Sequence, residues 1–226
     1  MWIISFISVA VTAAAVTILP DRVPMHSDIS GNIDRWGSKY ENFLFPAIIL
    51  ALALTMHLTI RHFEKQAENG RTEKEREGAR TNVKVLGIVG AAMAAMFTVM
   101  QCFILYGAYT GAKENAAEMT VDIGKVSCIL LGLMFIVVGN FMTKTRINRV
   151  VGIRVSWSMY NDTTWQKSNR FSAITIIIAG VLTILTAVLM KNSFTAMMLM
   201  LGYLLAAVIL ALIYAHKVYK AEKESE

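Results

Sequence analysis

Six long apolar runs constrain this chain more than any other feature of its sequence. They cover residues 2–19, 43–60, 85–110, 123–142, 171–190 and 194–215. A helix needs about 20 mostly apolar residues to cross the hydrocarbon core of a bilayer. The sequence therefore predicts an all-α, polytopic integral membrane protein with six transmembrane helices, and it leaves no polar stretch long enough for a soluble domain. Residues 1–226 are expected to form a single membrane domain.

The distribution of basic residues predicts which side of the membrane each loop faces. Sixteen of the 22 Lys and Arg residues lie in loops 61–84 and 143–170 and in residues 216–226. Because Lys and Arg concentrate in cytoplasmic loops, these segments and both termini are expected in the cytoplasm, with loop 20–42 outside. This asymmetry accounts for the net charge of +6, so no direct contact with nucleic acid is expected.

The outside loop 20–42 is rich in residues that favour turns. Pro20 ends the first apolar run, and Pro24 and the sequence Ser30-Gly31-Asn32 follow it. We expect a hydrogen-bonded turn that closes over the outer mouth of the bundle, with Trp36 at the membrane interface.

Metal-ligand atoms occur in the same loop at His26, Asp28 and Asp34. A calcium loop requires glycine at its sixth position and a bidentate glutamate at its twelfth. Counted from Asp28, glycine is fourth and the twelfth residue is Lys39. The pattern is incomplete, so no metal is expected.

A polar stretch of 23 residues, from Asn148 to Arg170, separates two apolar runs. It contains Trp157 and Trp165, which would lie near one face of a helix. Its basic residues are Arg149, Arg154, Lys167 and Arg170. We interpret the stretch as an amphipathic helix in the inner interface, with basic side chains toward lipid phosphates. In the alternative, Arg154 and Asn148 close the inner end of the bundle.

Several smaller patterns predict how the helices pack. Gln101 and Asn140 lie within apolar runs, where amide side chains usually form interhelical hydrogen bonds. Gly107 and Gly111 form a GxxxG pattern that favours close packing within the bundle. Loop 61–84 is expected to form a solvated helical hairpin that breaks at Asn69-Gly70.

The sequence contains no nucleophile elbow, phosphate loop or zinc-protease helix. His57 and His62 are five residues apart and no glutamate follows His57, so they do not form a zinc-protease pair. We therefore predict that the protein is not an enzyme and needs no cofactor.

Both polar segments resemble the SdpI-type immunity protein family. The outside motif of that family, Leu-Pro-x-x-x-Pro-x-His and then Gly-x-x-Asp, is matched by Pro20, Pro24, His26, Gly31 and Asp34. The inside motif is matched by Asn148, Gly152, Arg154, Trp157, Trp165 and Arg170. Asn169 stands where many relatives carry a histidine, which removes a titratable group and argues against proton transfer there.

The resemblance implies an immunity protein of the bacterial cytoplasmic membrane that resists a secreted, membrane-active peptide toxin. Its implied partners are the lipid bilayer, that toxin and, in some relatives, a cytoplasmic transcriptional repressor held at the membrane. The outside loop, with Asp28 and Trp36 beside the motif residues, is the expected toxin contact. The alternative function is a small transporter or channel, which a continuous hydrated cavity through the bundle would favour.

The predicted topology can be tested by cysteine labelling with a membrane-impermeant reagent. A cysteine placed at Ser30 should react in intact cells, whereas one placed at Thr72 should react only after the membrane is opened. The opposite result would reverse the orientation, because the basic asymmetry assigns Ser30 to the outside.

Overall fold

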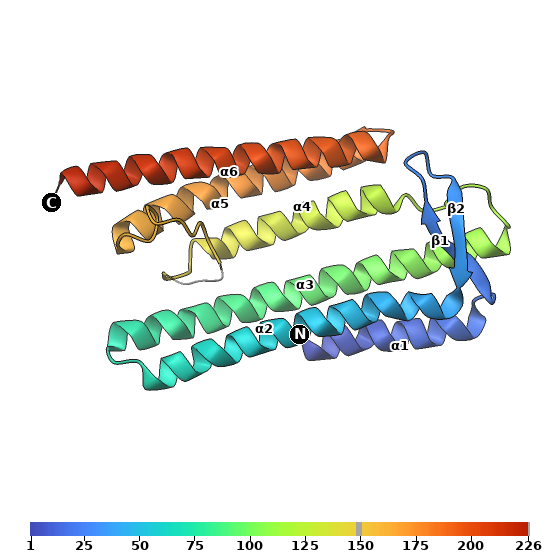
Figure 1. Cartoon of the computed structure of the whole chain (residues 1–226), viewed down its shortest axis with the longest axis horizontal. Helices are drawn as coiled ribbons and strands as arrows, with labels where there is room; N and C mark the ends of the chain where they lie inside the picture. The colour runs from blue at the N-terminus through green and yellow to red at the C-terminus, as the bar shows by residue number, and fades with distance from the viewer. Residues whose placement is uncertain (148–150, 226) are drawn as a thin grey trace.

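The computed structural model describes residues 1–147 and 151–225, and that part of the chain forms a long helical bundle (Figure 1). The helices are α1 Trp2–Ile18, α2 Leu44–Asn69, α3 Glu73–Lys113, α4 Ile123–Met142, α5 Asp162–Leu189 and α6 Ser193–Glu224. Five of the described helices are long and apolar enough to span a membrane, and α1 is a shorter apolar helix of 17 residues. The predicted polytopic helical membrane fold is confirmed.

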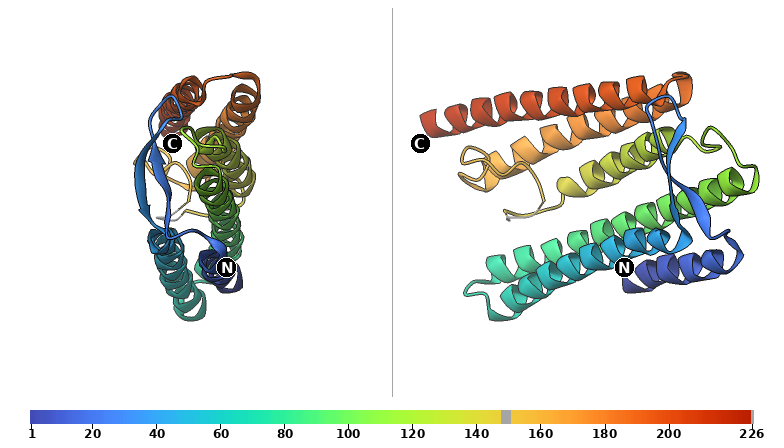
Figure 2. Two further views of the ribbon diagram at one scale, coloured as in Figure 1. Left: turned by 90° about the vertical axis from the view of Figure 1, so that its right-hand side faces the viewer. Right: turned by 45° about the vertical axis from the view of Figure 1, so that its right-hand side comes forward.

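The helices form two units of three, α1–α3 and α4–α6, which lie side by side (Figure 2). Within the second unit α4 and α5 approach closely, because Gly132 faces Gly180. A Cβ atom on Gly132 would lie 2.8 Å from the carbonyl oxygen of Gly180. Small residues permit such close backbone contact between membrane helices. The two units meet mainly where α3 packs on α4.

The α2–α3 hairpin forms as the sequence predicts. Helix α2 ends at Asn69, and α3 begins at Glu73 after Gly70. The Thr72 side chain accepts a hydrogen bond from the Glu75 N–H and Glu75 reaches back to the Thr72 N–H, which satisfies free donors at the start of α3. Both long helices extend beyond the start of α1 at this end of the molecule (Figure 1).

A two-stranded antiparallel sheet within loop 20–42 was not predicted. Strand β1 covers Arg22–Ser27, β2 covers Ile33–Ser38, and a 3-10 helix, η1, follows over Lys39–Phe43. The hairpin lies across one end of the bundle, which we call the hairpin end (Figure 1). The opposite end, formed by residues 61–84, 143–147, 151–161 and 216–225, is the basic end.

Interhelical hydrogen bonds were predicted for two amide side chains, and the prediction is confirmed for Gln101. Its side chain is fully buried, and its Nε2 donates to the Thr12 hydroxyl of α1 at 3.0 Å and to the Asn42 carbonyl at 3.1 Å. One amide thereby joins α1, α3 and η1. The prediction is wrong for Asn140, whose side chain is exposed near the end of α4.

Replacing Gln101 by Met should lower the free energy of unfolding of the detergent-solubilised protein by about 1 kcal/mol. The volume is conserved, but two hydrogen bonds between elements are lost, each of which contributes roughly 0.6 kcal/mol in membrane proteins. Thermal unfolding measures the change. Cys102→Ala is the matched control, because the neighbouring Cys102 is exposed. Equal stability of Gln101→Met and wild type would show that the amide does not hold these elements together.

Candidate functional site

The hairpin is fixed to the helices by one apolar contact at its base. Val23 is fully buried against Leu19 of the chain before it and against Leu105 and Ala108 of α3. A Cβ atom on Gly111 would lie 2.9 Å from the ring of Pro24, so the second glycine of the GxxxG pattern makes room for this proline. The pattern therefore serves packing within the chain, as predicted.

The tip of the hairpin is closed by Asp28. Its Oδ1 accepts hydrogen bonds from the backbone N–H groups of Ser30 and Asn32, both at 2.9 Å, and Gly31 adopts φ +94°. The Asn32 side-chain amide and these N–H groups lower the pKa of Asp28 below its ordinary value. Asp28 is thus an ionised carboxylate that is used by its own turn.

The tip is also bonded to the connection between α3 and α4. The Ile33 N–H donates to the Ala117 carbonyl, and the Met119 N–H donates to the Gly31 carbonyl, both at 2.8 Å. These bonds extend the sheet pairing by one bridge, between Asn32 and Glu118. Both ends of the hairpin are therefore held, so its position over the bundle is preformed.

His26 and Asp34 face each other across the two strands. His26 Nδ1 lies 2.6 Å from Asp34 Oδ1, and both side chains are exposed. Asp28 does not join them, and the described residues contain no group of three or more His, Cys, Asp or Glu side chains that could hold a metal ion. The pair can orient the imidazole for a polar contact with a ligand.

Glu41 fixes the exit of the hairpin into η1. Its Oε1 accepts from the Ser38 N–H and its Oε2 accepts from Arg35, both at 2.9 Å. The Ser38 N–H, and then Arg35, hold the pKa of Glu41 below its ordinary value. The neighbouring Trp36 is half-buried, as a residue at a membrane interface would be.

A groove of about 780 Å³ lies beside the hairpin tip. Three segments line it: the tip at 26–31, the start of α4 with the chain before it at 118–119 and 121–124, and the α5–α6 link with the start of α6 at 191–194 and 197. Its lining is mixed, with apolar Ile29, Phe194 and Met197 beside acidic, amide and lysine side chains. It is the candidate ligand site at the hairpin end.

The predicted loop residues divide into two groups around this groove. His26, Asp28 and Gly31 line it, whereas Pro20, Pro24, Asp34 and Trp36 do not. Pro24 anchors the hairpin and Asp34 holds His26. Phe194 and Met197 also line the groove and were not predicted as site residues. The three residues between the last two apolar runs did indicate that α6 starts close to the end of α5.

At the basic end, Gly152 and Asn169 fasten the chain between α4 and α5. Gly152 adopts φ +118°, and a Cβ atom there would lie 2.3 Å from Asn169 Oδ1. Asn169 Oδ1 accepts from the Ile153 N–H at 2.9 Å, and its Nδ2 donates to the Trp165 carbonyl at 3.0 Å. The backbone at Ile153 is neither helix nor strand, so its N–H has no partner within regular secondary structure. The buried side-chain amide of Asn169 on α5 supplies that partner.

The prediction of an amphipathic helix in the inner interface is wrong. Helix α5 begins at Asp162, and Asn161 caps it by accepting a hydrogen bond from the Thr164 N–H at 2.8 Å. Trp165 therefore lies on α5, is 1% exposed, and donates its indole N–H to the Thr145 carbonyl at 2.9 Å. Trp157 lies in the preceding turns and packs on His216 of α6, with 4.6 Å between ring centres.

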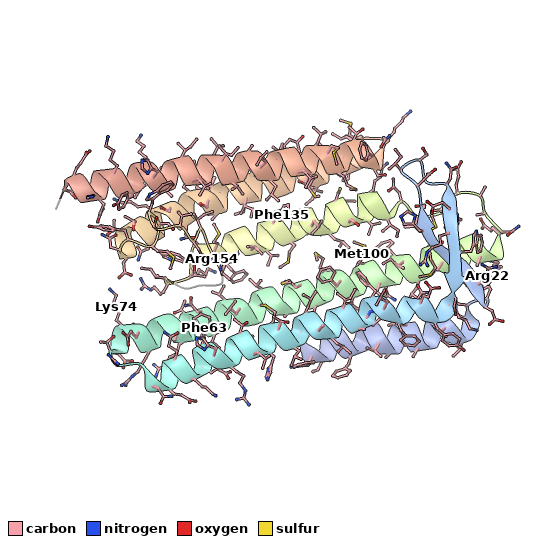
Figure 3. All side chains as sticks on the ribbon, viewed as in Figure 1. Arg22, Phe63, Lys74, Met100, Phe135 and Arg154 are labelled. Atoms are coloured by element: carbon pink, nitrogen blue, oxygen red, sulfur yellow. The ribbon has the colours of Figure 1, made fainter. Side chains whose placement is uncertain are left out.

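The structure gathers only part of the predicted inside motif. Gly152, Trp165 and Asn169 meet, whereas Arg154 and Arg170 are exposed elsewhere at this end. Arg154 and Lys74 lie at the basic end, and Arg22 lies at the hairpin end (Figure 3). Asn148 and Arg149 fall outside the described residues, so the predicted plug of Arg154 and Asn148 stays a prediction.

A second cavity, of about 360 Å³, lies between the two helical units near the basic end. It is mostly apolar and is lined by side chains from α2, α3, α4, α5 and α6, with residues 151–153 at its edge. It shares no lining residue with the hairpin-end groove in the described part of the chain.

Two family models match parts of the chain. The model of the SdpI/YfhL protein family matches residues 144–215, which begin just after α4 and cover the fastened segment, α5 and most of α6. Over these residues the chain is similar to the SdpI/YfhL family. The model of a domain of unknown function, DUF1648, matches residues 3–50, which carry α1, the hairpin and η1.

One similar protein is Immunity protein SdpI of Bacillus subtilis (strain 168). The two sequences are 22% identical over 182 residues, which cover 79% of this chain and 74% of the relative. The similarity therefore extends over most of both chains, and the family resemblance predicted from the two motifs is confirmed. No solved structure matches the chain significantly.

Replacing Gly152 by Ala should lower the stability of the protein by roughly 2 kcal/mol, because a non-glycine residue is strained in this conformation. The methyl group would also displace Asn169 and break its bond to Ile153. Thermal unfolding and limited proteolysis between α4 and α5 measure the effect. Gly87→Ala is the matched control, since a Cβ atom there meets nothing within 4 Å. An equally small effect of both substitutions would contradict the fastening role of Gly152.

Proposed function

We propose that this protein is a membrane immunity protein that protects the cell from a secreted, membrane-active peptide. The peptide binds in the hairpin-end groove before it can insert into the bilayer. The name of the Bacillus subtilis relative, Immunity protein SdpI, supports the first part of the proposal. The shape and lining of the groove support the second.

The mixed lining of the groove carries the proposal. A peptide that acts on membranes presents apolar and polar side chains together, and the groove offers both kinds of contact. Ile29 and Phe194 supply exposed apolar surface from opposite walls. Ligand sites commonly measure about 300–1,000 Å³, so the volume of about 780 Å³ can hold several side chains of a peptide.

The rigidity of the hairpin supports binding. Val23 and Pro24 hold its base, and backbone bonds to Ala117 and Met119 hold its tip. A preformed site loses less conformational entropy when its ligand binds, so more of the contact energy appears as affinity.

The orientation that follows from the basic asymmetry supports the same assignment. With the basic end in the cytoplasm, the groove faces outward, where a secreted peptide arrives. A cytoplasmic repressor would instead meet the basic end, and that partner stays a prediction. The transporter alternative has less support, because the groove and the apolar cavity share no lining residue in the described residues.

Groove variants should lower survival when toxin-sensitive cells that express the protein are challenged with membrane-active bacterial peptides. For a peptide against which wild type protects, Ile29→Ser and Phe194→Ala should each raise the peptide's potency roughly tenfold, because central apolar contacts dominate peptide binding. Killing curves, with membrane levels measured in parallel, test this.

Leu201→Ala is the matched control for the groove variants. Leu201 lies on α6 like Phe194 and is similarly exposed, at 50% against 43%, but it is outside the groove. Full protection by Ile29→Ser and Phe194→Ala would remove the groove from the mechanism. Loss of protection in the Leu201→Ala variant as well would indicate a general effect of α6.

A further inference from the structure

A polar pocket of about 390 Å³ opens at the basic end, far from the groove. Its lining includes Thr81 of α3, Thr143, Lys144 and Arg146 after α4, and Gln166 and Arg170 of α5. Three of these side chains are cationic and no residue of the lining is acidic. The pocket is therefore a concentration of positive charge formed by three separate parts of the chain.

The backbone that carries two of the cations is held in place. Thr145, between Lys144 and Arg146, is 4% exposed, and its carbonyl accepts the indole N–H of Trp165 at 2.9 Å. The Thr145 hydroxyl donates to the Met142 carbonyl at 2.8 Å. Because the backbone of Thr145 is fixed, the positions of Lys144 and Arg146 on either side of it are restricted. Trp165 therefore acts as a positioning residue for this pocket.

Three acidic residues on the neighbouring helices are paired outside the pocket. Glu73 pairs with Arg76 and Arg80, and Asp162 pairs with Lys74. Glu222 of α6 lies 4.0 Å from Lys167 and also accepts a hydrogen bond from Asn161. Within the described residues, neither Lys144 nor Arg170 forms an ion pair, so their charge is available to a ligand.

The pocket lies at the depth of lipid headgroups. Helix α4 has 20 residues and is therefore about 30 Å long, which matches the hydrocarbon core, and Lys144 is the second residue after its end. Arg170 likewise precedes the apolar run of α5 that starts at Phe171. The cations of the pocket thus face the layer in which lipid phosphates lie.

We propose that this pocket binds the phosphate of an anionic lipid headgroup. Arg146 and Arg170 offer planar guanidinium groups that bind phosphate oxygens in pairs, and Lys144 adds a third charge. The hydroxyls of Thr81 and Thr143 donate to the helix carbonyls of Glu77 and Asn140, so Lys144, Arg170 and Gln166 remain as donors for the phosphate. Basic pockets between membrane helices bind such headgroups.

Native mass spectrometry of the detergent-purified protein tests the proposal. Wild type, titrated with phosphatidylglycerol or phosphatidylcholine, should retain one phosphatidylglycerol preferentially. The triple variant Lys144→Gln, Arg146→Gln, Arg170→Gln should bind it about a hundredfold more weakly, since each cation near an anionic surface contributes roughly a factor of five. The matched control is Lys65→Gln, Lys217→Gln, Lys223→Gln, which removes three exposed charges from the same end outside the pocket.

The control should bind phosphatidylglycerol like wild type. Equal loss in both triple variants would overturn the site, because net charge alone would then explain retention, and unchanged binding in the pocket variant would also overturn it. Displacement of the lipid by millimolar inorganic phosphate would assign the pocket to free phosphate and overturn the lipid assignment. The single variant Arg170→Gln, at an exposed position, provides the same test if the triple variant does not fold.

Discussion

Every backbone N–H and C=O group inside the bilayer must find a partner within the protein, and this requirement organises the whole molecule. Helices satisfy it along the spans, so the described non-helical backbone is confined to the links and ends. At the hairpin end, strand pairing and the Asp28 turn satisfy the backbone. At the basic end, where no strands pair in the described residues, the side chains of Asn169 and Trp165 form hydrogen bonds with the backbone instead.

These two solutions give the ends different capacities. The hairpin projects exposed side chains, such as Ile29, from a backbone that is fixed at base and tip, which suits recognition of a ligand. The segment before α5 is pinned against α5 and α6, with Trp157 on His216 and Asn161 bonded to Glu222. That arrangement suits a fixed position at a headgroup layer. The proposed toxin contact and the proposed lipid site thus lie at opposite ends, and either can fail without the other.

Much of the fold could be predicted from the sequence, because the length of an apolar run acts over a whole segment. The helices, the break at Asn69-Gly70 and the short α5–α6 link all follow from such local patterns. The place of the hairpin over the bundle could not be predicted, because it depends on bonds from residues 31 and 33 to Met119 and Ala117, far along the chain. Trp165 was misplaced for a related reason: its position in the core is set by a hydrogen bond to Thr145, which no spacing of tryptophans reveals. The groove required Phe194 and Met197, whose approach to the hairpin is a property of the assembled bundle.

Crosslinking in living cells tests the central claim, that the groove holds the peptide, most directly. A photoreactive amino acid replaces Ile29 or Met197 in the groove, or Ile213 on the exposed surface of α6 nearer the basic end. Cells that survive a peptide challenge are then illuminated, and peptide adducts are identified by mass. The account predicts adducts from Ile29 and Met197 and none from Ile213. Protected cells with no adduct at the groove positions, or with equal adducts at all three, would contradict it.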